Sequence, residues 1–305
     1  MQFFIEVLIS GLLSGVMYAL VALGFVLIYK ASGVFNFAQG AMVFAAALTY
    51  VSIQKMPAVE ALGPAASFVV ALVVTMAAMV LLGLLTEKFV LRPLVNQPQI
   101  TLFMATIGLT FFVEGATQLL WGSQPHELKL GITDQPVESL LDATGMAISQ
   151  FDLFAAAVAA ILVAVLAVFF SRTKIGRALR AVADDHQAAL AVGIPLKHIW
   201  GIVWAVAGFV ALVAGLLWGA RNGVQFALTF TALKALPVLI LGGFESVPGA
   251  IVGGLIIGAS EKLAEVYIGP MVGGGIEGWF PYVLALLFLL VRPEGLFGER
   301  HIDRV

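Results

Sequence analysis

Long apolar stretches alternate with short polar or turn-forming ones along the whole chain, and this pattern predicts about nine membrane-spanning helices. A helix needs about 20 mostly apolar residues to cross the hydrocarbon core of a bilayer. The predicted spans are 4–29, 35–54, 65–86, 101–121, 151–171, 199–220, 228–243, 246–264 and 277–292. The seventh is short and is separated from the eighth only by "GGFESVPG", which predicts a tight turn. Merging these two would give eight spans.

Composition supports the same fold class. Of the 305 residues, 61% are hydrophobic and only 11% are charged, which a soluble domain with a polar surface does not tolerate. The sequence therefore predicts an all-α polytopic membrane protein, with residues 1–305 forming a single transmembrane domain and no separate soluble domain. The first apolar stretch lacks the basic start of a signal peptide, so we expect it to be retained as a span.

Positive charge sets the expected orientation, because Lys and Arg accumulate in cytoplasmic loops. Nine spans with a periplasmic N-terminus and a cytoplasmic C-terminus place eleven basic residues inside and four outside. The inner set is Lys30, Lys88, Arg92, Arg172, Lys174, Arg177, Arg180, Lys197, Arg292, Arg300 and Arg304; the outer set is Lys55, Lys129, Arg221 and Lys262. The acidic 122–150 loop is then periplasmic.

This orientation places a charged insert, residues 172–198, in the cytoplasm. Helical spacing over about 174–193 predicts an amphipathic helix that stops at Gly193, two residues before Pro195. Its apolar face holds Ile175, Leu179, Val182, His186, Ala189 and Leu190, and its polar face holds Arg177, Arg180, Asp184 and Ala188. An Arg180–Asp184 pair is worth only a few tenths of a kcal/mol. The alternatives are a solvated loop and a docking helix.

Within the insert, "QAALAVG" resembles the Glu-Ala-Ala-x-x-x-Gly cytoplasmic loop of bacterial ABC importer permeases, which fits a groove on the ATPase subunit. Gln187 stands where that motif has Glu, and the Ile-x-Leu-Pro continuation is absent. The residues that this resemblance and the insert nominate for ATPase coupling are Arg177, Arg180, Asp184, Asp185, Gln187, Ala188, Ala189 and Gly193.

Four stretches together, 12–48, 176–194, 241–258 and 292–298, resemble the LivH-type permease subunit of branched-chain amino acid ABC importers in order and spacing. The resemblance implies a second, LivM-like permease, two LivG/LivF-like ATPase subunits that bind ATP and Mg²⁺, a periplasmic substrate-binding protein, and the bacterial inner membrane. It leaves the substrate open between branched-chain or related amino acids, urea and short amides.

Polar residues inside predicted spans are the candidates for a substrate pathway, because such residues are costly unless they face protein or water. Asn36 and Gln39 lie in "ASGVFNFAQG", which predicts either an interrupted helix facing a cavity or a tight turn with Asn36 as a cap. Glu114 and Lys234 carry opposite charges that suit the two ends of an amino acid. They equally suit pairing with each other or snorkelling to an interface.

Glycine pairs four residues apart, Gly11/Gly15, Gly249/Gly253 and Gly254/Gly258, predict close helix packing, within the chain or with the partner permease. No phosphate-binding G-x-x-x-x-G-K-[ST] loop, no H-E-x-x-H and no G-x-S-x-G occurs, so we expect a transport subunit and not an enzyme. The chain has no cysteine and only four scattered histidines, which predicts no metal site, and a net charge of −2 argues against a nucleic-acid partner. The rival functions are a stand-alone secondary transporter or channel and a membrane scaffold.

Overall fold

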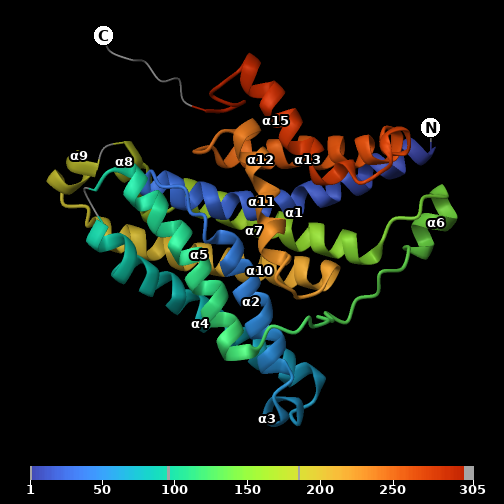
Figure 1. The fold of residues 1–305 in the computed structure, drawn as a ribbon, viewed down its shortest axis with the longest axis horizontal. Helices are drawn as coiled ribbons and strands as arrows, with labels where there is room; N and C mark the ends of the chain where they lie inside the picture. The colour runs from blue at the N-terminus through green and yellow to red at the C-terminus, as the bar shows by residue number, and fades with distance from the viewer. Residues whose placement is uncertain (1, 95–96, 185, 299–305) are drawn as a thin grey trace. The chain divides into compact units, whose positions relative to one another are not determined.

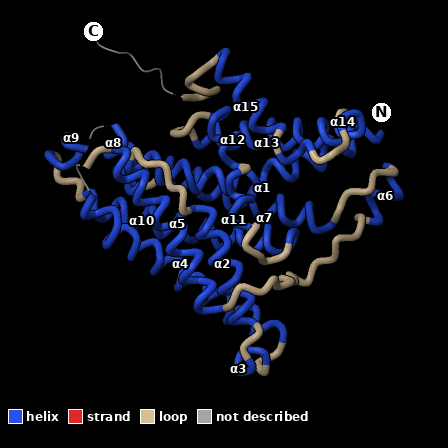
Figure 2. The backbone as a smooth tube through the Cα atoms, in the orientation of Figure 1, coloured by secondary structure: helices blue, strands red, loops and turns tan. Residues whose placement is uncertain are grey.

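The computed structural model describes residues 2–94, 97–184 and 186–298, and their regular structure is helical (Figures 1 and 2). Only isolated β-bridges accompany the helices in this part of the chain. The chain divides into two compact units. Unit 1 comprises 1–26, 131–166 and 234–305, and unit 2 comprises 27–130 and 167–233.

Each of the nine predicted spans is found as helix, although several bounds differ. The helices in these places are α1 (Gln2–Ser32), α2 (Gln39–Gln54), α4 (Pro64–Thr86), α5 (Gln99–Trp121), α7 (Gln150–Arg172), α10 (Leu196–Asn222), α11 (Leu228–Leu233) with α12 (Ala235–Gly242), α13 (Val247–Tyr267) and α15 (Phe280–Val291). A π-helical turn (Glu87–Leu91) and a 3₁₀ turn (Arg92–Leu94) extend α4. The short helices are α3 (Pro57–Glu60), α6 (Glu138–Thr144), α8 (Lys174–Asp184), α9 (His186–Ala191), α14 (Gly269–Val272) and a 3₁₀ turn (Ile276–Gly278).

Six of these helices in the described residues are long and apolar enough to cross a membrane: α1, the extended α4, α5, α7, α10 and α13. The all-α membrane class is therefore confirmed. The other three predicted spans are shorter; α2 has 16 residues and α15 has 12. Whether nine or eight segments cross, and in which orientation, stays a prediction.

The seventh and eighth segments do not merge into one helix, because the predicted turn is present. Gly243 has φ +101°, a conformation open to glycine, and ends α12. The Ser246 hydroxyl then accepts a hydrogen bond from the Gly249 N–H at 3.0 Å and caps α13. The seventh segment is itself interrupted at Lys234. The cause is Pro237, whose ring excludes the carbonyl four residues earlier from the helical hydrogen-bond ladder.

Unit 2 is built around α10, which packs against α2 and α4 and is largely buried. Glycines make these contacts close: an ideal Cβ at Gly208 would lie 2.5 Å from the Met79 carbonyl oxygen, and one at Gly215 would lie 2.5 Å from that of Val43. At the end of α10, Val224 forms an antiparallel bridge with His126. Burial and the charge of Lys55, whose Nζ lies 3.3 Å from the ring, lower the pKa of His126, so this histidine is neutral at pH 7.

In unit 1, the predicted glycine pairs join α1 to α13 and α12 to α13. An ideal Cβ at Gly11 would lie 2.7 Å from the Gly258 carbonyl oxygen, and one at Gly253 would lie 2.6 Å from that of Val238. Gly15 meets Gly254 in the same way. The prediction of close packing is confirmed, and all three pairs are used inside the chain, so they do not need the partner permease.

We expect Gly254→Leu to destabilise the protein strongly. An ideal Cβ at Gly254 lies 2.6 Å from the Gly15 carbonyl oxygen, so a larger side chain must push α1 away from α13. Overpacking typically costs about 1–3 kcal/mol, and a backbone neighbour cannot rotate aside. Thermal unfolding in detergent measures the effect. Gly115→Leu in α5 is the matched control, because nothing lies within 4 Å of its ideal Cβ; an equal loss in both variants would contradict the prediction.

Candidate functional site

The described part of the charged insert is helical over Lys174–Asp184 (α8) and His186–Ala191 (α9), within the range 174–193 that the sequence predicted as an amphipathic helix. The Thr173 hydroxyl accepts a hydrogen bond from the Gly176 N–H at 3.1 Å, close to the start of α8. α9 ends at Ala191, and Gly193 follows with φ +86°. The Ile194 N–H donates to the Ala189 carbonyl at 3.0 Å, as in a glycine-terminated helix end. The predicted helix stop at Gly193 is confirmed.

The base of the insert is fixed to the end of α7. The Arg180 guanidinium donates to the carbonyl oxygens of Phe170 at 2.7 Å and Ser171 at 3.4 Å. A cation at these unpaired carbonyls also interacts favourably with the helix dipole. Gly176 packs directly on the Phe170 carbonyl, where a Cβ would overlap it. α7 and α8 are therefore joined by a tight turn around Thr173, which we call the elbow. The Arg180 hydrogen bonds hold the two helices together across it.

The apolar face of the insert is only partly as predicted. Leu179 and Val182 are buried, at 2% and 0% exposure, and so is Ala189. Leu190, predicted on the same face, is instead 52% exposed, and Val192 is 76% exposed. The tip of the insert therefore presents two aliphatic side chains outward.

The residues proposed for ATPase coupling differ in their exposure to solvent, and some lie outside the described residues. Arg177 is exposed, Arg180 is half-buried in the elbow, and Ala189 is buried and cannot contact a partner directly. Asp185 lies outside the described residues. The side chains of Asp184, Gln187 and Ala188 also lie outside what the structure describes, although their backbone is helical.

Arg180→Ala is expected to uncouple motion of the insert from α7. The variant leaves the carbonyls of Phe170 and Ser171 without their charged donor, and such a hydrogen bond contributes about 1.5–3 kcal/mol at most. If the insert docks ATPase subunits, as the resemblance implies, we expect uptake per ATP hydrolysed to fall several-fold while those subunits stay bound. Parallel assays of uptake and ATP hydrolysis in proteoliposomes measure this ratio. Arg180→Lys keeps a cation and should restore part of the ratio; no difference between the two variants would contradict the elbow's role.

Asn36 and Gln39 lie together in unit 2, where α1 gives way to α2. Both side chains are fully buried. The Asn36 side-chain oxygen accepts from the Ala38 N–H at 3.1 Å, and its amide donates to the Gln39 side-chain oxygen at 3.3 Å. Gln39 donates in turn to the Ala207 carbonyl of α10 at 3.5 Å. The predicted tight turn is therefore present, and it moves the start of α2 from the predicted residue 35 to Gln39. The prediction of Asn36 as the cap is wrong, because the N-cap is Ala38 and the Asn36 oxygen bonds to the Ala38 N–H, not to an N–H in the first turn of α2.

A further polar group is buried where α2, α5 and α11 of unit 2 approach one another. The Glu114 carboxyl group is 6% exposed and lies near the Thr229 side chain of α11. The Thr229 hydroxyl makes no hydrogen bond of standard geometry in the described residues. An ideal Cβ at Gly40 would lie 2.5 Å from the Thr229 carbonyl oxygen, so α2 and α11 touch here. These groups add a buried carboxyl group and a hydroxyl group to the buried amides of Asn36 and Gln39 in unit 2.

Lys234 belongs to a buried cluster in unit 1. Its Nζ lies 3.0 Å from Glu261 Oε1 of α13, and the Tyr18 hydroxyl donates to the same oxygen at 3.1 Å. The Glu261 side chain is 3% exposed and that of Lys234 is 25% exposed. Lys234 therefore forms an ion pair with Glu261 of its own unit.

Sequence reasoning missed Glu261 and Tyr18. Glu261 falls inside the predicted span 246–264, and a carboxylate in a span was the signal that should have singled it out. Among the nominated pathway residues, the structure brings Asn36 and Gln39 into contact, and it places Glu114 in the same unit and Lys234 in the other.

The comparisons with known proteins agree with the resemblance read from the sequence. The family model described as "Branched-chain amino acid transport system / permease component" matches residues 7–292. The chain is 28% identical to the permease protein LivH of the high-affinity branched-chain amino acid transport system of Escherichia coli K12, covering 99% of this chain and 98% of LivH. It is 29% identical to BraD of Pseudomonas aeruginosa, again over 99% and 98%. LivM of Escherichia coli K12 is 28% identical over 45% of this chain and 32% of its own length.

Proposed function

The chain belongs to the family of branched-chain amino acid transport permeases, and from this premise we propose that it is the membrane-spanning subunit of an ATP-driven importer for branched-chain or related amino acids. The observation that carries the proposal is the full-length family match. A second observation supports it: Arg180 hydrogen-bonds the base of the charged insert to α7, and Leu190 and Val192 are exposed near its other end.

The insert provides the mechanical part of the proposal. In this scheme ATPase subunits bind the tip of the insert, and their closure on ATP displaces α8. Because Arg180 hydrogen-bonds α8 to the end of α7, α7 moves with it. Within this scheme the coupling residues are Arg177, Arg180, Asp184, Asp185, Gln187, Ala188, Ala189 and Gly193. Ala189 acts through packing, because it is buried.

The substrate pathway in this proposal uses the buried polar residues. Asn36, Gln39 and Glu114 in unit 2 supply amide and carboxylate groups for a polar solute, and Lys234 in unit 1 supplies a cation. Helix interruptions at Asn36 and Lys234 support this role, because interrupted helices are how transporters expose backbone groups to a substrate.

The proposed partners follow from the same scheme. They are a second, LivM-like permease, two LivG/LivF-like ATPase subunits that hold ATP and Mg²⁺, and a periplasmic substrate-binding protein, assembled in a bacterial inner membrane. LivH of Escherichia coli and BraD of Pseudomonas aeruginosa, each matched over 98% of its length, are permeases of high-affinity branched-chain amino acid transport systems, which supports a multi-subunit importer.

Purification in mild detergent followed by reconstitution tests the proposal. We expect ATPase subunits and a second permease to co-purify, and the assembled complex with its binding protein to take up leucine or valine only with ATP. Uptake of urea or short amides instead would assign the chain to that branch of the importers. Ion-driven uptake by the chain alone in liposomes would overturn the proposal in favour of a secondary transporter using Glu114.

A further inference from the structure

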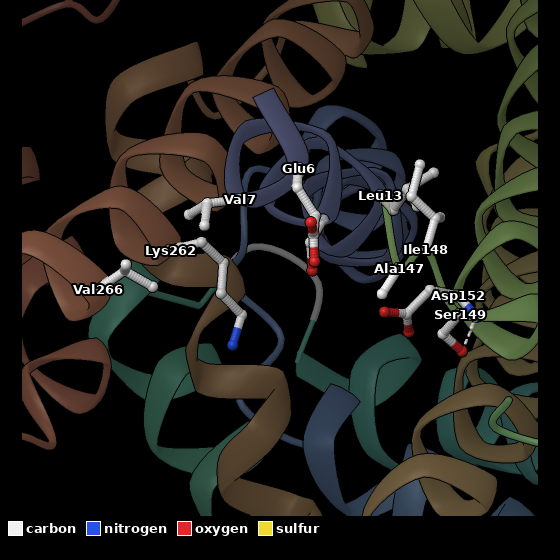
Figure 3. Close-up of a pocket in the computed structure, with 10 residues that line it drawn as sticks. Glu6, Val7, Leu13, Ala147, Ile148, Ser149, Asp152, Lys262 and Val266 are labelled. Atoms are coloured by element: carbon white, nitrogen blue, oxygen red, sulfur yellow. Dashed lines mark hydrogen bonds between the residues drawn. The ribbon is translucent and has the colours of Figure 1, made fainter. Parts of the chain in front are cut away.

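A small pocket in unit 1 has the lining expected of a binding site (Figure 3). Its volume is about 210 Å³, and its walls come from the first turns of α1, the segment leading into α7, the first turn of α7 and the last turns of α13. Three charged side chains from three helices, Glu6, Asp152 and Lys262, point into the same space in Figure 3.

The helix ends around the pocket agree with an external position. The predicted orientation places the start of α1, the start of α7 after the 122–150 loop, and the end of α13 all on the periplasmic side. The structure brings these three ends, which are far apart in the chain, to one pocket.

The pocket's charges suit a zwitterion. Glu6 forms no ion pair within the described residues. The Asp152 carboxylate already takes part in another interaction, but its two oxygens can accept further hydrogen bonds, so a primary ammonium group finds acceptors on both residues. Lys262 pairs with Glu277 at 3.0 Å, and both side chains are part-exposed, at 29% and 41%. Exposed pairs of this kind contribute little, so a ligand carboxylate can replace Glu277 at small cost.

Apolar and hydroxyl groups complete the lining. Val7, Leu13 and Ile148 offer an aliphatic wall, and Ser10 offers a hydroxyl. Ser149 is already engaged, since it donates to Asp134 and accepts from the Asp152 N–H. The volume lies below the about 300–1,000 Å³ typical of pockets for drug-sized ligands, so only a small molecule fits.

We propose that this pocket is an outer subsite for a small aliphatic α-amino acid, with its ammonium between Glu6 and Asp152 and its carboxylate on Lys262. The inference rests on the proposed function, because the pocket would bind the substrate after its release from the binding protein and before it enters the membrane. Aliphatic contact with Val7, Leu13 and Ile148 then favours a branched side chain.

The absence of cysteine from the chain makes a direct test possible, because Ser10→Cys introduces its one thiol. In the assembled complex without ATP, we expect an ammonium-bearing methanethiosulfonate to modify this thiol at least tenfold faster than a sulfonate-bearing one. Glu127→Cys on the exposed outer loop is the control and should show no such preference. Equal rates at Ser10→Cys would overturn the proposal.

Small molecules that bind the pocket should protect the Ser10→Cys thiol from modification, and comparing leucine with its analogues shows which ligand groups are needed for binding. We expect L-leucine to slow modification of Ser10→Cys at least threefold, 3-methylbutylamine to slow it less, and 4-methylpentanoate, which lacks the ammonium, to have no effect. Glu6→Gln and Asp152→Asn added to Ser10→Cys should abolish both the charge preference and the protection. Protection by 4-methylpentanoate equal to that by leucine, or protection that survives both substitutions, would overturn the proposal.

Uptake assays separate the two proposals. In the cysteine-free chain, Glu6→Gln should raise the KM for leucine uptake about tenfold and leave kcat near that of the unsubstituted chain. If the unsubstituted complex shows ATP-driven leucine uptake and Glu6→Gln leaves KM unchanged, the pocket proposal fails alone. If the unsubstituted complex shows no ATP-driven uptake, the proposed function fails.

Discussion

Replacing Leu190 and Val192 together by arginine is expected to remove the ATPase subunits from the purified complex and to lower ATP-driven uptake by more than tenfold. These residues are 52% and 76% exposed at the tip of the insert, next to the predicted docking motif. Apolar side chains at the centre of an interface commonly carry much of its binding energy, and an unpaired guanidinium buried there is costly. Co-purification in mild detergent measures the association directly.

The control for this experiment is Leu141→Arg in α6. Leu141 is a similarly exposed aliphatic residue, at 39%, and it lies in the loop predicted to face the periplasm. We expect this variant to keep its ATPase subunits. Retention of the ATPases by the Leu190→Arg/Val192→Arg protein would show that the insert is not the docking element, and would favour the solvated loop or the scaffold.

Breaking the buried ion pair of unit 1 on one side should have the largest effect on stability. Removing one partner of such a pair typically costs about 3–5 kcal/mol, because the other charge stays buried and unpaired. Lys234→Met leaves the Glu261 carboxylate with only the Tyr18 hydroxyl as donor, and Glu261 Oε2 already lacks a partner within the described residues. We expect a clear fall in the midpoint of thermal unfolding in detergent, near the lower end of that range since Lys234 is part-exposed.

The double variant Lys234→Met/Glu261→Gln makes the test specific. Neutral glutamine can still accept from Tyr18 and leaves no unpaired charge, so we expect it to recover most of the lost stability. A double variant as unstable as the single one would show that the loss came from packing around Lys234 and not from the stranded carboxylate. Ion pairs of this kind are often replaceable without loss of stability, so retained stability with lost uptake would point to a role in transport.

The positions of the helices follow from local properties of the sequence and were therefore predictable. Apolar length alone located α4, α5, α7 and α10 to within a few residues. The turn at Gly243 and the stop at Gly193 were also predicted, because a positive φ there needs glycine. The start of α2 was missed by four residues, since the Asn36 turn depends on a side-chain hydrogen bond that periodicity does not report.

Partnerships between distant residues were not predictable from the same local signals. Lys234 and Glu261 are 27 positions apart, and only the packing of helices decides which cation meets which carboxylate. The glycine spacings predicted close helix packing but did not indicate which helices pack together. The structure shows that α1 packs against α13 through these glycines. The pocket at Glu6, Asp152 and Lys262 needs three helix ends to meet, and nothing in the sequence near any one of them indicates the other two.

Unit 1 is assembled from both ends of the chain and a central segment, so its first helix is synthesised long before the helices that pack against it. Gly15 of α1 finds its contact at Gly254, which leaves the ribosome about 240 residues later. At a synthesis rate of about 5–20 residues per second, α1 lies in the bilayer for on the order of 10–50 s before α13 covers the surface at Gly11 and Gly15. The contact between α1 and α13, and with it the assembly of unit 1, can therefore form only after most of the chain has been synthesised.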